Sequence, residues 1–303
     1  MRVAITGATG TIGTRLVREL TARGDEVTVL SRNPDRARPA LGAGVQVVRW
    51  DPDAGAAPRE ALDGRDGVVN LAGEPVAQRW NAEAKQRILA SRELGTRNLV
   101  AGLRAAEPRP RVLVSSSAVG YYGPHGDEVL TEDTPAGSDF LAQVCLAWER
   151  EADRVAELGV RVVKIRTGVV LDRRGGALAK MLLPFRMGVG GPVAGGQQYM
   201  PWIHVDDVVG ILLAAVDDER WTGPVNASAP APVTNKAFSK ALGRALRRPA
   251  FSPVPALAIR ALYGEMAEIV TKGQRVVPER AQALGYRYRH PDLDEALRSA
   301  VGK

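Results

Sequence analysis

Short apolar segments alternate with longer amphipathic segments over the first half of the chain. Apolar runs of strand length occupy residues 3–6, 26–30, 45–49, 67–71, 111–116 and 160–165. Apolar side chains at helical spacing fill much of the chain between them, at residues 14–23, 82–106 and 140–158. Strands that alternate with helices favour right-handed crossovers and a parallel sheet covered on both faces. The pattern therefore predicts an α/β fold built on a doubly wound parallel sheet.

The first predicted strand leads directly into a turn with three evenly spaced glycines, Gly7, Gly10 and Gly13. Gly7 permits a tight turn, Gly10 lets the main chain approach a phosphate, and Gly13 lets the following helix pack close to the sheet. Bare backbone N–H groups at a helix start bind a pyrophosphate, so we expect a Rossmann-type domain with a dinucleotide at this turn. The residues of the turn expected to contact it are Gly7, Thr9, Gly10, Thr11, Ile12 and Gly13.

The end of the second predicted strand indicates which dinucleotide binds. NAD-specific domains place an acidic side chain there, which holds the ribose 2′-hydroxyl. This chain has Ser31 and Arg32 instead. A hydroxyl and a guanidinium bind a 2′-phosphate through charge-assisted hydrogen bonds, so the sequence predicts NADP as the cofactor. In the alternative interpretation, Arg32 belongs only to a solvated basic turn with Arg36 and Arg38.

The character of the sequence changes after Thr167. Residues 169–200 contain many glycines beside an apolar run, which predicts loop-rich structure around a ligand site. Residues 205–216 have the apolar spacing of a helix that returns to the sheet, and Asp206 and Asp207 are expected to cap it. We expect an NADP-binding domain from residues 1–168 and 201–216, and a smaller C-terminal substrate lobe from residues 169–200 and 217–303.

Composition and charge narrow the classes of function. The formal net charge is +7, but the basic residues are spread along the chain and mixed with acids, so we expect no nucleic-acid partner. No apolar run reaches the roughly 18 residues of a membrane span, and the N-terminus does not resemble a signal peptide. The single cysteine, Cys145, excludes an internal disulfide and fits the cytoplasm. The three histidines lack ligand spacing, so no metal site is expected, and the sequence indicates no oligomeric state.

Several short motifs resemble those of one enzyme class. They are TGATGTIG at 6–13, NLAG at 70–73, SSSAVGYYG at 115–123, RTG at 166–168 and WIHVDD at 202–207. Together they resemble the extended or atypical short-chain dehydrogenases/reductases, the class of nucleotide-sugar epimerases and dehydratases. Residues 70–75, 182–186 with 190–192, 198–204 and 285–297 are similar to the epimerase-like branch that includes human short-chain dehydrogenase family 39U. The resemblance covers nearly the whole chain and is more specific for the fold than for the reaction.

This resemblance implies cofactor contacts at the ends of several strands. Beyond the glycine turn they are Ser31, Arg32, Leu71, Ala72, Gly73, Glu74, Arg92, Ser115, Arg166, Gly168 and Val170. By the same resemblance Arg92 would reach the cofactor from the side, Ser115 would lie near the nicotinamide, and residues 166–170 would close over that ring. For residues 71–73 a buried strand end with a tight turn is the alternative, and both interpretations can hold together.

Two residues that active members of the class use are absent. Those members exchange the substrate proton through a tyrosine, and a lysine four residues later lowers the pKa of that tyrosine and holds the nicotinamide ribose. Helical i, i+4 spacing puts both groups on one face, where the ammonium stabilises the phenolate. In the predicted helix 140–158 these positions fall on Leu141 and Cys145, and neither can perform this chemistry. Cys145 there fits a small core residue better than a nucleophile.

The remaining candidate catalytic residues are Ser117, Tyr121 and Tyr122. Ser117 stands where the class hydrogen-bonds the substrate carbonyl. A proton donor must then come from Tyr121 or Tyr122, followed by Glu132, although no neighbour in sequence supplies a positive charge. Aromatic packing beneath the cofactor is the alternative role of the two tyrosines.

Two functional hypotheses fit these features. The first is an NADP(H)-dependent oxidoreductase or epimerase-like enzyme that acts on a polar carbonyl or hydroxyl of a small-molecule substrate, with nucleotide sugars as one candidate. The second is a non-catalytic NADP(H)-binding module that senses redox state and acts through a partner. Ser117 and the substrate lobe favour the enzyme, whereas the missing tyrosine and lysine motivate the sensor.

Overall fold

A seven-stranded parallel sheet forms the centre of the computed structural model, which describes residues 1–302. In spatial order its strands are β11 (Gly223–Ala227), β7 (Arg161–Thr167), β5 (Val112–Ala118), β4 (Gly67–Asn70), β1 (Arg2–Thr6), β2 (Glu26–Ser31) and β3 (Val45–Arg49). All six strands expected from the apolar pattern are present, and every neighbouring pair is parallel. The predicted doubly wound α/β fold is confirmed.

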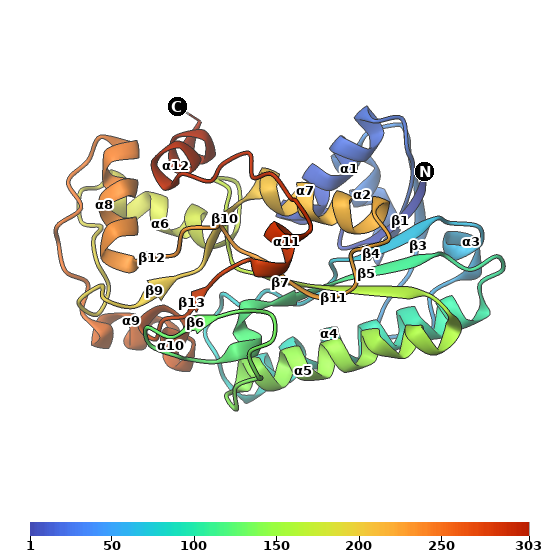
Figure 1. Cartoon of the computed structure of the whole chain (residues 1–303), viewed down its shortest axis with the longest axis horizontal. Coiled ribbons are helices and arrows are strands. Elements are labelled where there is room, and N and C mark those ends of the chain that lie inside the picture. The colour runs from blue at the N-terminus through green and yellow to red at the C-terminus, as the bar shows by residue number, and fades with distance from the viewer. Residues whose placement is uncertain (303) are drawn as a thin grey trace.

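Helices cover both faces of this sheet (Figure 1). On one face lie α1 (Thr11–Ala22), α2 (Pro34–Leu41) and α7 (Val205–Asp217), and on the other α3 (Arg59–Leu62), α4 (Ala82–Ala105) and α5 (Phe140–Asp153). Successive side chains of a strand point to opposite faces. Val3 and Ile5 therefore pack with α1 and α7, whereas Ala4 packs with the α4 layer. Because both faces are buried, the strands read as continuous apolar runs.

One strand and one helix of this sheet lie outside the expected domain range. β11 pairs in parallel with β7, Val225 opposite Ile165, and α11 (Glu279–Ala283) places Ala281 in the same core. The expected boundary at residue 217 is corrected accordingly, because residues 223–227 and 279–283 belong to the nucleotide domain. β11 has the sequence GPVNA, and its glycine, proline and asparagine are poor strand formers that hide it from pattern analysis.

The smaller lobe has a core of its own. It is formed by α6 (Gly176–Arg186), α8 (Asn235–Leu246) and α12 (Leu293–Val301), with Leu178, Phe238 and Leu297 in its centre. The shorter elements are β6 (Val129–Leu130), β8 (Val169–Leu171), β9 (Tyr199–Met200), β10 (Trp202–His204), β12 (Val233–Thr234), α9 (Ala256–Tyr263), α10 (Ala267–Thr271), β13 (Arg275–Val276) and the 3-10 turns η1 (Val119–Tyr122), η2 (Arg154–Leu158) and η3 (Gly264–Met266). Residues 169–200, expected to be loop-rich, thus contain α6, whose interior Pro184 disguises it.

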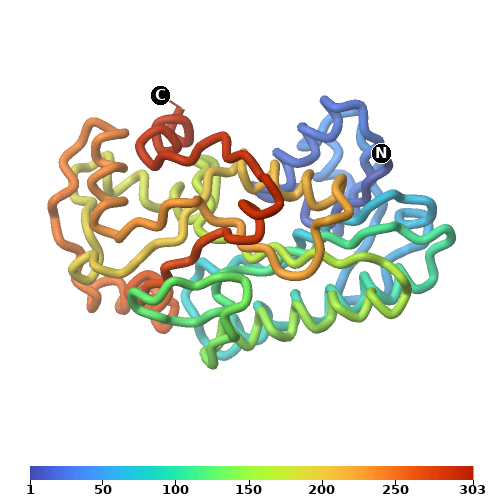
Figure 2. The backbone as a smooth tube through the Cα atoms, viewed as in Figure 1, coloured from blue at the N-terminus to red at the C-terminus, as the bar shows by residue number. Residues whose placement is uncertain are grey.

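The C-terminal segment joins the two parts of the molecule. Figure 2 shows it leaving the lobe, passing beside β11 and α7, and returning to α12. Asp207 fixes this path, because its carboxylate accepts the backbone N–H groups of Arg289 and His290 at 2.7 and 3.0 Å. The expected capping role of Asp207 is therefore corrected, and His204 caps α7 instead. No helix within residues 1–302 is long and apolar enough to cross a bilayer.

Candidate cofactor and active site

The glycine turn after β1 shows which glycines the protein itself requires. Gly7 has a φ of 67°, and a Cβ there would lie 2.6 Å from the carbonyl carbon of Leu71. A Cβ on Gly13 would lie 2.5 Å from the carbonyl oxygen of Gly7. A Cβ on Gly10 would meet nothing closer than that oxygen at 3.3 Å, and the φ of Gly10, −77°, is open to any residue. The space in front of Gly10 is therefore free for a ligand.

The N-terminus of α1 is not capped by the protein. Gly10 at the N-cap offers no side chain, and the first turn of α1 carries no acidic residue. By contrast, Asn81 caps α4 and Asp139 caps α5. The first N–H groups of a helix have no intrahelical partner and carry the positive end of its dipole. Thr9 and Gly10 are exposed beside them, so this end of α1 can accept an anion.

A hydroxyl at the end of β1 fixes the exit of β4. Thr6 Oγ1 donates to Asn70 Oδ1 at 2.7 Å and accepts the N–H groups of Leu71 and Ala72, each at 3.2 Å. Leu71 and Ala72 are half-buried and Gly73 is exposed, so the expected cofactor contacts of this segment lie beside the glycine turn. Sequence reasoning gave Thr6 no separate role, although a threonine paired in register with a buried asparagine signals such a link.

The end of β2 carries an unpaired positive charge. Arg32 is exposed and has no hydrogen-bond or ion-pair partner among residues 1–302, whereas Arg38 pairs with Asp35 at 2.9 Å. The Ser31 hydroxyl accepts the N–H of Asn33 at 3.2 Å. Arg49, which sequence reasoning missed, lies beside Ser31 in the register of β3 and is also exposed. The arrangement suits a phosphate at this strand end.

Arg92 places a second cation beside the exit of β4. Its Nη1 donates to the carbonyl oxygens of Glu74 and Ile88 at 3.0 and 3.1 Å, and its guanidinium lies 5.0 Å from the ring centre of Trp148. A Cβ on Gly73 would lie 3.0 Å from the Cζ of Arg92. Burial lowers the pKa of Arg92, because no carboxylate in the described chain forms an ion pair with it. The expected side approach to the cofactor path is compatible with this position.

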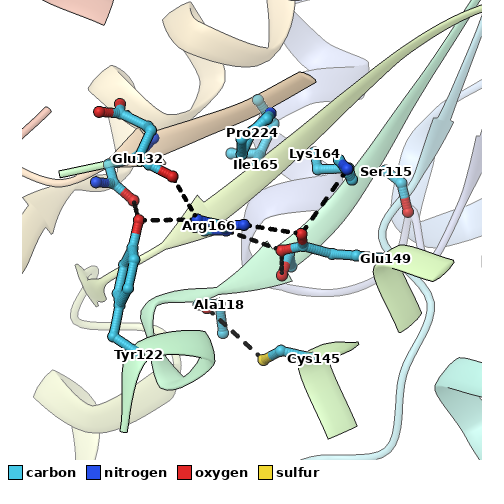
Figure 3. Close-up of polar contacts among 12 residues, drawn as sticks. Ser115, Ala118, Tyr122, Glu132, Cys145, Glu149, Lys164, Ile165, Arg166 and Pro224 are labelled. Atoms are coloured by element: carbon cyan, nitrogen blue, oxygen red, sulfur yellow. Dashed lines mark hydrogen bonds and ion pairs between the residues drawn. The ribbon is translucent and has the colours of Figure 1, made fainter. Parts of the chain in front are cut away.

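Arg166 is held inside the protein (Figure 3). Its Nε and Nη2 donate to the carboxylate of Glu149 at 2.9 and 3.0 Å, and its Nη1 donates to the carbonyl oxygen of Glu132 at 3.1 Å. Burial alone lowers the pKa of Arg166, but the hydrogen bonds and charge of Glu149 outweigh it and raise the pKa. Arg166 is 3% exposed. The guanidinium of Arg166 therefore serves the core, and the expected closure of residues 166–170 over the nicotinamide stays a prediction.

The two candidate tyrosines have different surroundings. Tyr122 is 0% exposed, donates to Asn226 Oδ1 at 2.6 Å and accepts from Arg166 Nη1 at 3.1 Å. Burial raises the pKa of Tyr122 to about 12. The candidate role of Tyr122 as proton donor is therefore corrected, because its buried hydroxyl already donates a hydrogen bond to Asn226. Tyr121 is half-buried, its ring centre lies 3.4 Å from the Cζ of Arg166, and its hydroxyl has no partner among the described residues.

Leu141 and Cys145, at the positions of the missing tyrosine and lysine, are held by contacts with the protein itself. Leu141 packs against Gly120, where an added Cβ would lie 3.1 Å from the Cβ of Leu141. The thiol of Cys145 donates to the carbonyl oxygen of Ala118 at 3.6 Å, and burial raises the pKa of Cys145 to about 12, so the thiol stays protonated. The hydroxyl of the neighbouring Ser117 donates to Glu149 Oε1 at 2.6 Å. Its proton is therefore directed at the protein.

The other expected contacts lie within β5, just after β7 and in β8. Ser115 is buried beside Asn70 in the sheet register. Gly168 lies where an added Cβ would approach the Pro201 carbonyl oxygen to 2.4 Å, and Val170 pairs with Ile203. The further proton-donor candidate Glu132 is buried, which raises its pKa, and its Oε1 accepts the N–H groups of Asn226 and Arg280 at 2.9 and 3.2 Å. Glu132 thus holds β11 and α11 in place.

Comparison with known families gives two matches along the chain. The model described as "NAD dependent epimerase/dehydratase family" matches residues 3–226. A model described as "Domain of unknown function (DUF1731)" matches residues 254–300. The first match spans the glycine turn, the proposed active-site elements and β11, and the second covers most of the chain from α9 to α12.

Curated relatives and solved structures extend this similarity. The chain is 40% identical to the human epimerase family protein SDR39U1, over 99% of this chain and 100% of that protein, and 42% identical to the chloroplastic SDR39U1 homolog of Arabidopsis thaliana, over 99% and 87%. A crystal structure of human SDR39U1 with NADPH has a TM-score of 0.90 at 39% identity and covers 100% of both chains. The nucleoside-diphosphate sugar epimerase of Corynebacterium glutamicum has a TM-score of 0.80 at 34% identity, over 100% of this chain and 58% of that one.

Proposed function

Because the chain belongs to the NAD dependent epimerase/dehydratase family, we propose that it is an enzyme that uses NADP(H) to oxidise or reduce a polar carbonyl or hydroxyl group of a small molecule. The human relative, crystallised with NADPH, supports this cofactor. The name of the Corynebacterium relative supports a nucleotide sugar as one candidate substrate. The cytoplasmic location predicted from the sequence stays a prediction.

The observation that carries the cofactor proposal is the pair of anion sites at the ends of β1 and β2. The open Gly10 backbone and uncapped α1 suit a pyrophosphate. The unpaired Arg32 at the end of β2 suits the 2′-phosphate that distinguishes NADP from NAD. Both groups serve one elongated, doubly anionic ligand better than two separate ions, because β1 and β2 are adjacent in the sheet.

For the chemical step, the bound cofactor supplies or accepts a hydride and the chain must move a proton. Tyr121 is the candidate for this proton transfer, because it alone of the three proposed catalytic residues has a hydroxyl without a partner in the described chain. Ser117 lies in the same region, and its oxygen can still accept a hydrogen bond while its proton is held by Glu149. Ser117 is therefore proposed as a group that orients the substrate.

Replacement of Arg32 tests the cofactor proposal. Arg32→Ala is expected to weaken NADPH binding at least about tenfold, because a charge-assisted hydrogen bond to the 2′-phosphate contributes about 1.5–3 kcal/mol. NADH affinity is expected to stay unchanged. Calorimetric titration of both cofactors gives the measurement, and Arg38→Ala, whose side chain pairs with Asp35, is the matched control. Equal NADPH affinity in wild type and Arg32→Ala would contradict the 2′-phosphate assignment.

Turnover assays test the enzyme itself. Purified chain is incubated with NADPH and a panel of carbonyl compounds, and with nucleotide sugars whose products are analysed for epimers. Tyr121→Phe is expected to lower kcat about 10²-fold or more while NADPH affinity stays the same, as for loss of a general acid. NADPH binding without turnover of any compound would overturn the enzyme proposal.

A non-catalytic NADP(H) sensor is the second candidate. Leu141 and the protonated Cys145 favour it, because they leave the nicotinamide side without the usual proton-transfer pair. A sensor must bind NADPH and NADP⁺ with different affinities, since a ligand shifts an equilibrium only through differential binding. Equal affinities together with no captured partner would exclude this candidate.

A further inference from the structure

A polar cavity lies between the nucleotide domain and the smaller lobe. It has a volume of about 280 Å³ and is formed by α1, the segment that follows β8, the start of α7 and the end of α12. Its polar lining consists mainly of Arg15, Arg18, Asp172, Arg173, Arg174 and His204. Neither the glycine turn nor any of the candidate catalytic residues lines it.

The cavity contains more positive charge than its carboxylates neutralise. Arg174 pairs with Asp172 at 2.9 Å, and Arg15 Nε lies 3.2 Å from the Asp206 carboxylate. Arg18 has no hydrogen-bond or ion-pair partner within residues 1–302. Arg173 donates only to the carbonyl oxygen of Val301, at 3.5 Å. Four guanidinium groups around one cavity repel each other, and an anion between them would remove that repulsion.

His204, one of the residues that line the cavity, has a buried ring nitrogen without a partner. His204 is 1% exposed, and its Nδ1 accepts the backbone N–H of Asp206 at 3.1 Å as the cap of α7. Burial lowers the pKa of His204 to about 4, so the ring is neutral near pH 7. A neutral ring that accepts at Nδ1 carries its proton on Nε2. That Nε2 is buried and has no partner in the described chain, which is unfavourable for a donor.

These features fit an anion better than a metal ion. His204, Asp206 and His290 place ligand atoms within 4.8 Å of one another, as a cation site would. The nitrogen of His204 nearest to the Asp206 carboxylate is Nδ1, at 3.5 Å. A metal on Nδ1 would displace the backbone N–H of Asp206, and the cap of α7 would then be lost. Arg15 already lies on the Asp206 carboxylate, and the neighbouring arginines would repel a cation. A tetrahedral oxyanion would meet the unpaired donors of Arg18 and Arg173, while the Asp172 carboxylate in the lining is neutralised by Arg174.

We propose that this cavity binds an oxyanion of the phosphate class, either inorganic phosphate or the phosphate of a monoester, through Arg18, Arg173 and the Nε2–H of His204. The site is separate from the dinucleotide turn, because Arg15 and Arg18 lie one and two helical turns beyond Thr11. The anion contacts α1 of the nucleotide domain and the chain at the end of α12, so it ties the two parts of the molecule together.

Calorimetric titration of the full chain tests this proposal. Inorganic phosphate and glycerol 3-phosphate are titrated at constant ionic strength, with saturating NADPH to occupy the glycine turn. We expect saturable binding of at least one of them, and the tighter one identifies the source of the anion. The double variant Arg18→Ala/Arg173→Ala is expected to weaken this binding at least about tenfold, as for the loss of two charge-assisted hydrogen bonds. Both side chains are exposed, so the variant is expected to fold.

The control and the overturning results are defined by the same titration. Arg104→Ala removes an exposed arginine of α4 outside the cavity and is expected to leave phosphate binding unchanged. Equal phosphate affinity in the double variant and in Arg104→Ala would overturn the proposal, as would the absence of saturable binding. Saturable Zn²⁺ binding that disappears in His290→Ala would also overturn it, because the cluster would then hold a metal. NADPH affinity, measured separately, reports on the cofactor proposal independently.

Discussion

Gly10 and Gly13 are both glycines for different reasons: Gly13 is required by the packing of the protein, and Gly10 by the space for a ligand. Gly13→Ala is expected to destabilise the fold by about 1–3 kcal/mol, because its Cβ would lie 2.5 Å from the Gly7 carbonyl oxygen, an overpacked contact. Gly10→Ala is expected to keep its unfolding temperature close to that of wild type and to weaken NADPH binding at least about tenfold, since its Cβ would occupy the ligand's space. Thermal unfolding and NADPH titration of both variants measure the difference. A fully retained NADPH affinity in Gly10→Ala would contradict this.

At the scale of the residue, the sequence predicts what depends on near neighbours and fails for what depends on distant ones. The turn from Gly7 to Gly13 and the unpaired Arg32 follow from local spacing and from the absence of an acid. The role of Tyr122 could not be predicted in this way, because Asn226, 104 residues away, accepts the hydrogen bond of its hydroxyl. Nor could that of Arg166, whose place is set by a carboxylate on α5, Glu149. A carboxylate within an apolar helix face is the one signal that indicates such an internal pair.

The pairing of β7 with α5 depends on the Arg166–Glu149 ion pair. Glu149→Gln is expected to reduce the free energy of unfolding by about 3–5 kcal/mol, because it leaves a buried guanidinium without its counter-charge. It also weakens the acceptor of the Ser117 proton. Chemical denaturation gives the measurement, and Glu157→Gln, an exposed partner of Arg104, is the control with little expected change. A Glu149→Gln variant as stable as the control would show that solvent, not Glu149, neutralises Arg166.

The stability of α7 depends on pH through its capping residue, His204. Burial lowers the pKa of His204 from 6.5 to about 4, so between these values the unfolded chain binds a proton that the folded chain does not. Stability therefore falls as the pH is lowered from 6.5 towards 4, and the loss is absent above 6.5. His204→Asn keeps a capping oxygen and removes the titration. The unfolding temperature of this variant is expected to fall less over the same pH range, and parallel curves for variant and wild type would contradict the assignment.

At the scale of the element, helices and strands with a regular apolar pattern are predicted well, whereas elements that contain glycine and proline are not. The helix expected at 82–106 is observed as Ala82–Ala105, because many of its apolar positions face the core. The helix Gly176–Arg186 was not predicted, because its glycine, its proline and its many apolar residues hide the periodic pattern of a helix with one buried face. β11 was not predicted, because its strand conformation depends on pairing with β7, and the sequence GPVNA would not adopt that conformation alone.

Asp207 holds the C-terminal segment against the nucleotide domain of the whole molecule. It is fully buried, it accepts two backbone N–H groups of that segment, and the hydroxyl of Tyr286 lies within 3.3 Å of its Oδ1. Asp207→Ala is expected to lower the free energy of unfolding by about 2–6 kcal/mol, since each buried donor left unpaired costs about 1–3 kcal/mol. Limited proteolysis is expected to cut first near residues 284–292. Asp133→Ala, at an exposed site, is the control, and the same cleavage pattern in both variants would contradict the assignment.

At the scale of the whole molecule, the fold class was predictable and the division into domains was not. The order of strands and helices determines the doubly wound sheet, because crossover handedness leaves few alternatives. The sequence contains no comparable rule for a chain that leaves a sheet and comes back. Residues 223–227 and 279–283 return to the sheet from the lobe. Only the pairing of the first segment with β7, and the packing of the second in the core that contains Val3, reveal this return.

The return of the C-terminal segment also affects how the protein is made. A ribosome delivers residues in order. Among the last pieces of the nucleotide core, β11 emerges after α6 of the lobe, and α11 emerges after both α6 and α8. Until β11 emerges the nascent chain exposes the outer edge of β7, and until α11 emerges the core on one face of the sheet lacks Ala281. N-terminal domains commonly fold during synthesis, but this one must wait for a segment near the end of translation. Its biogenesis is therefore expected to need protection from edge-to-edge association between the synthesis of β7 and that of β11.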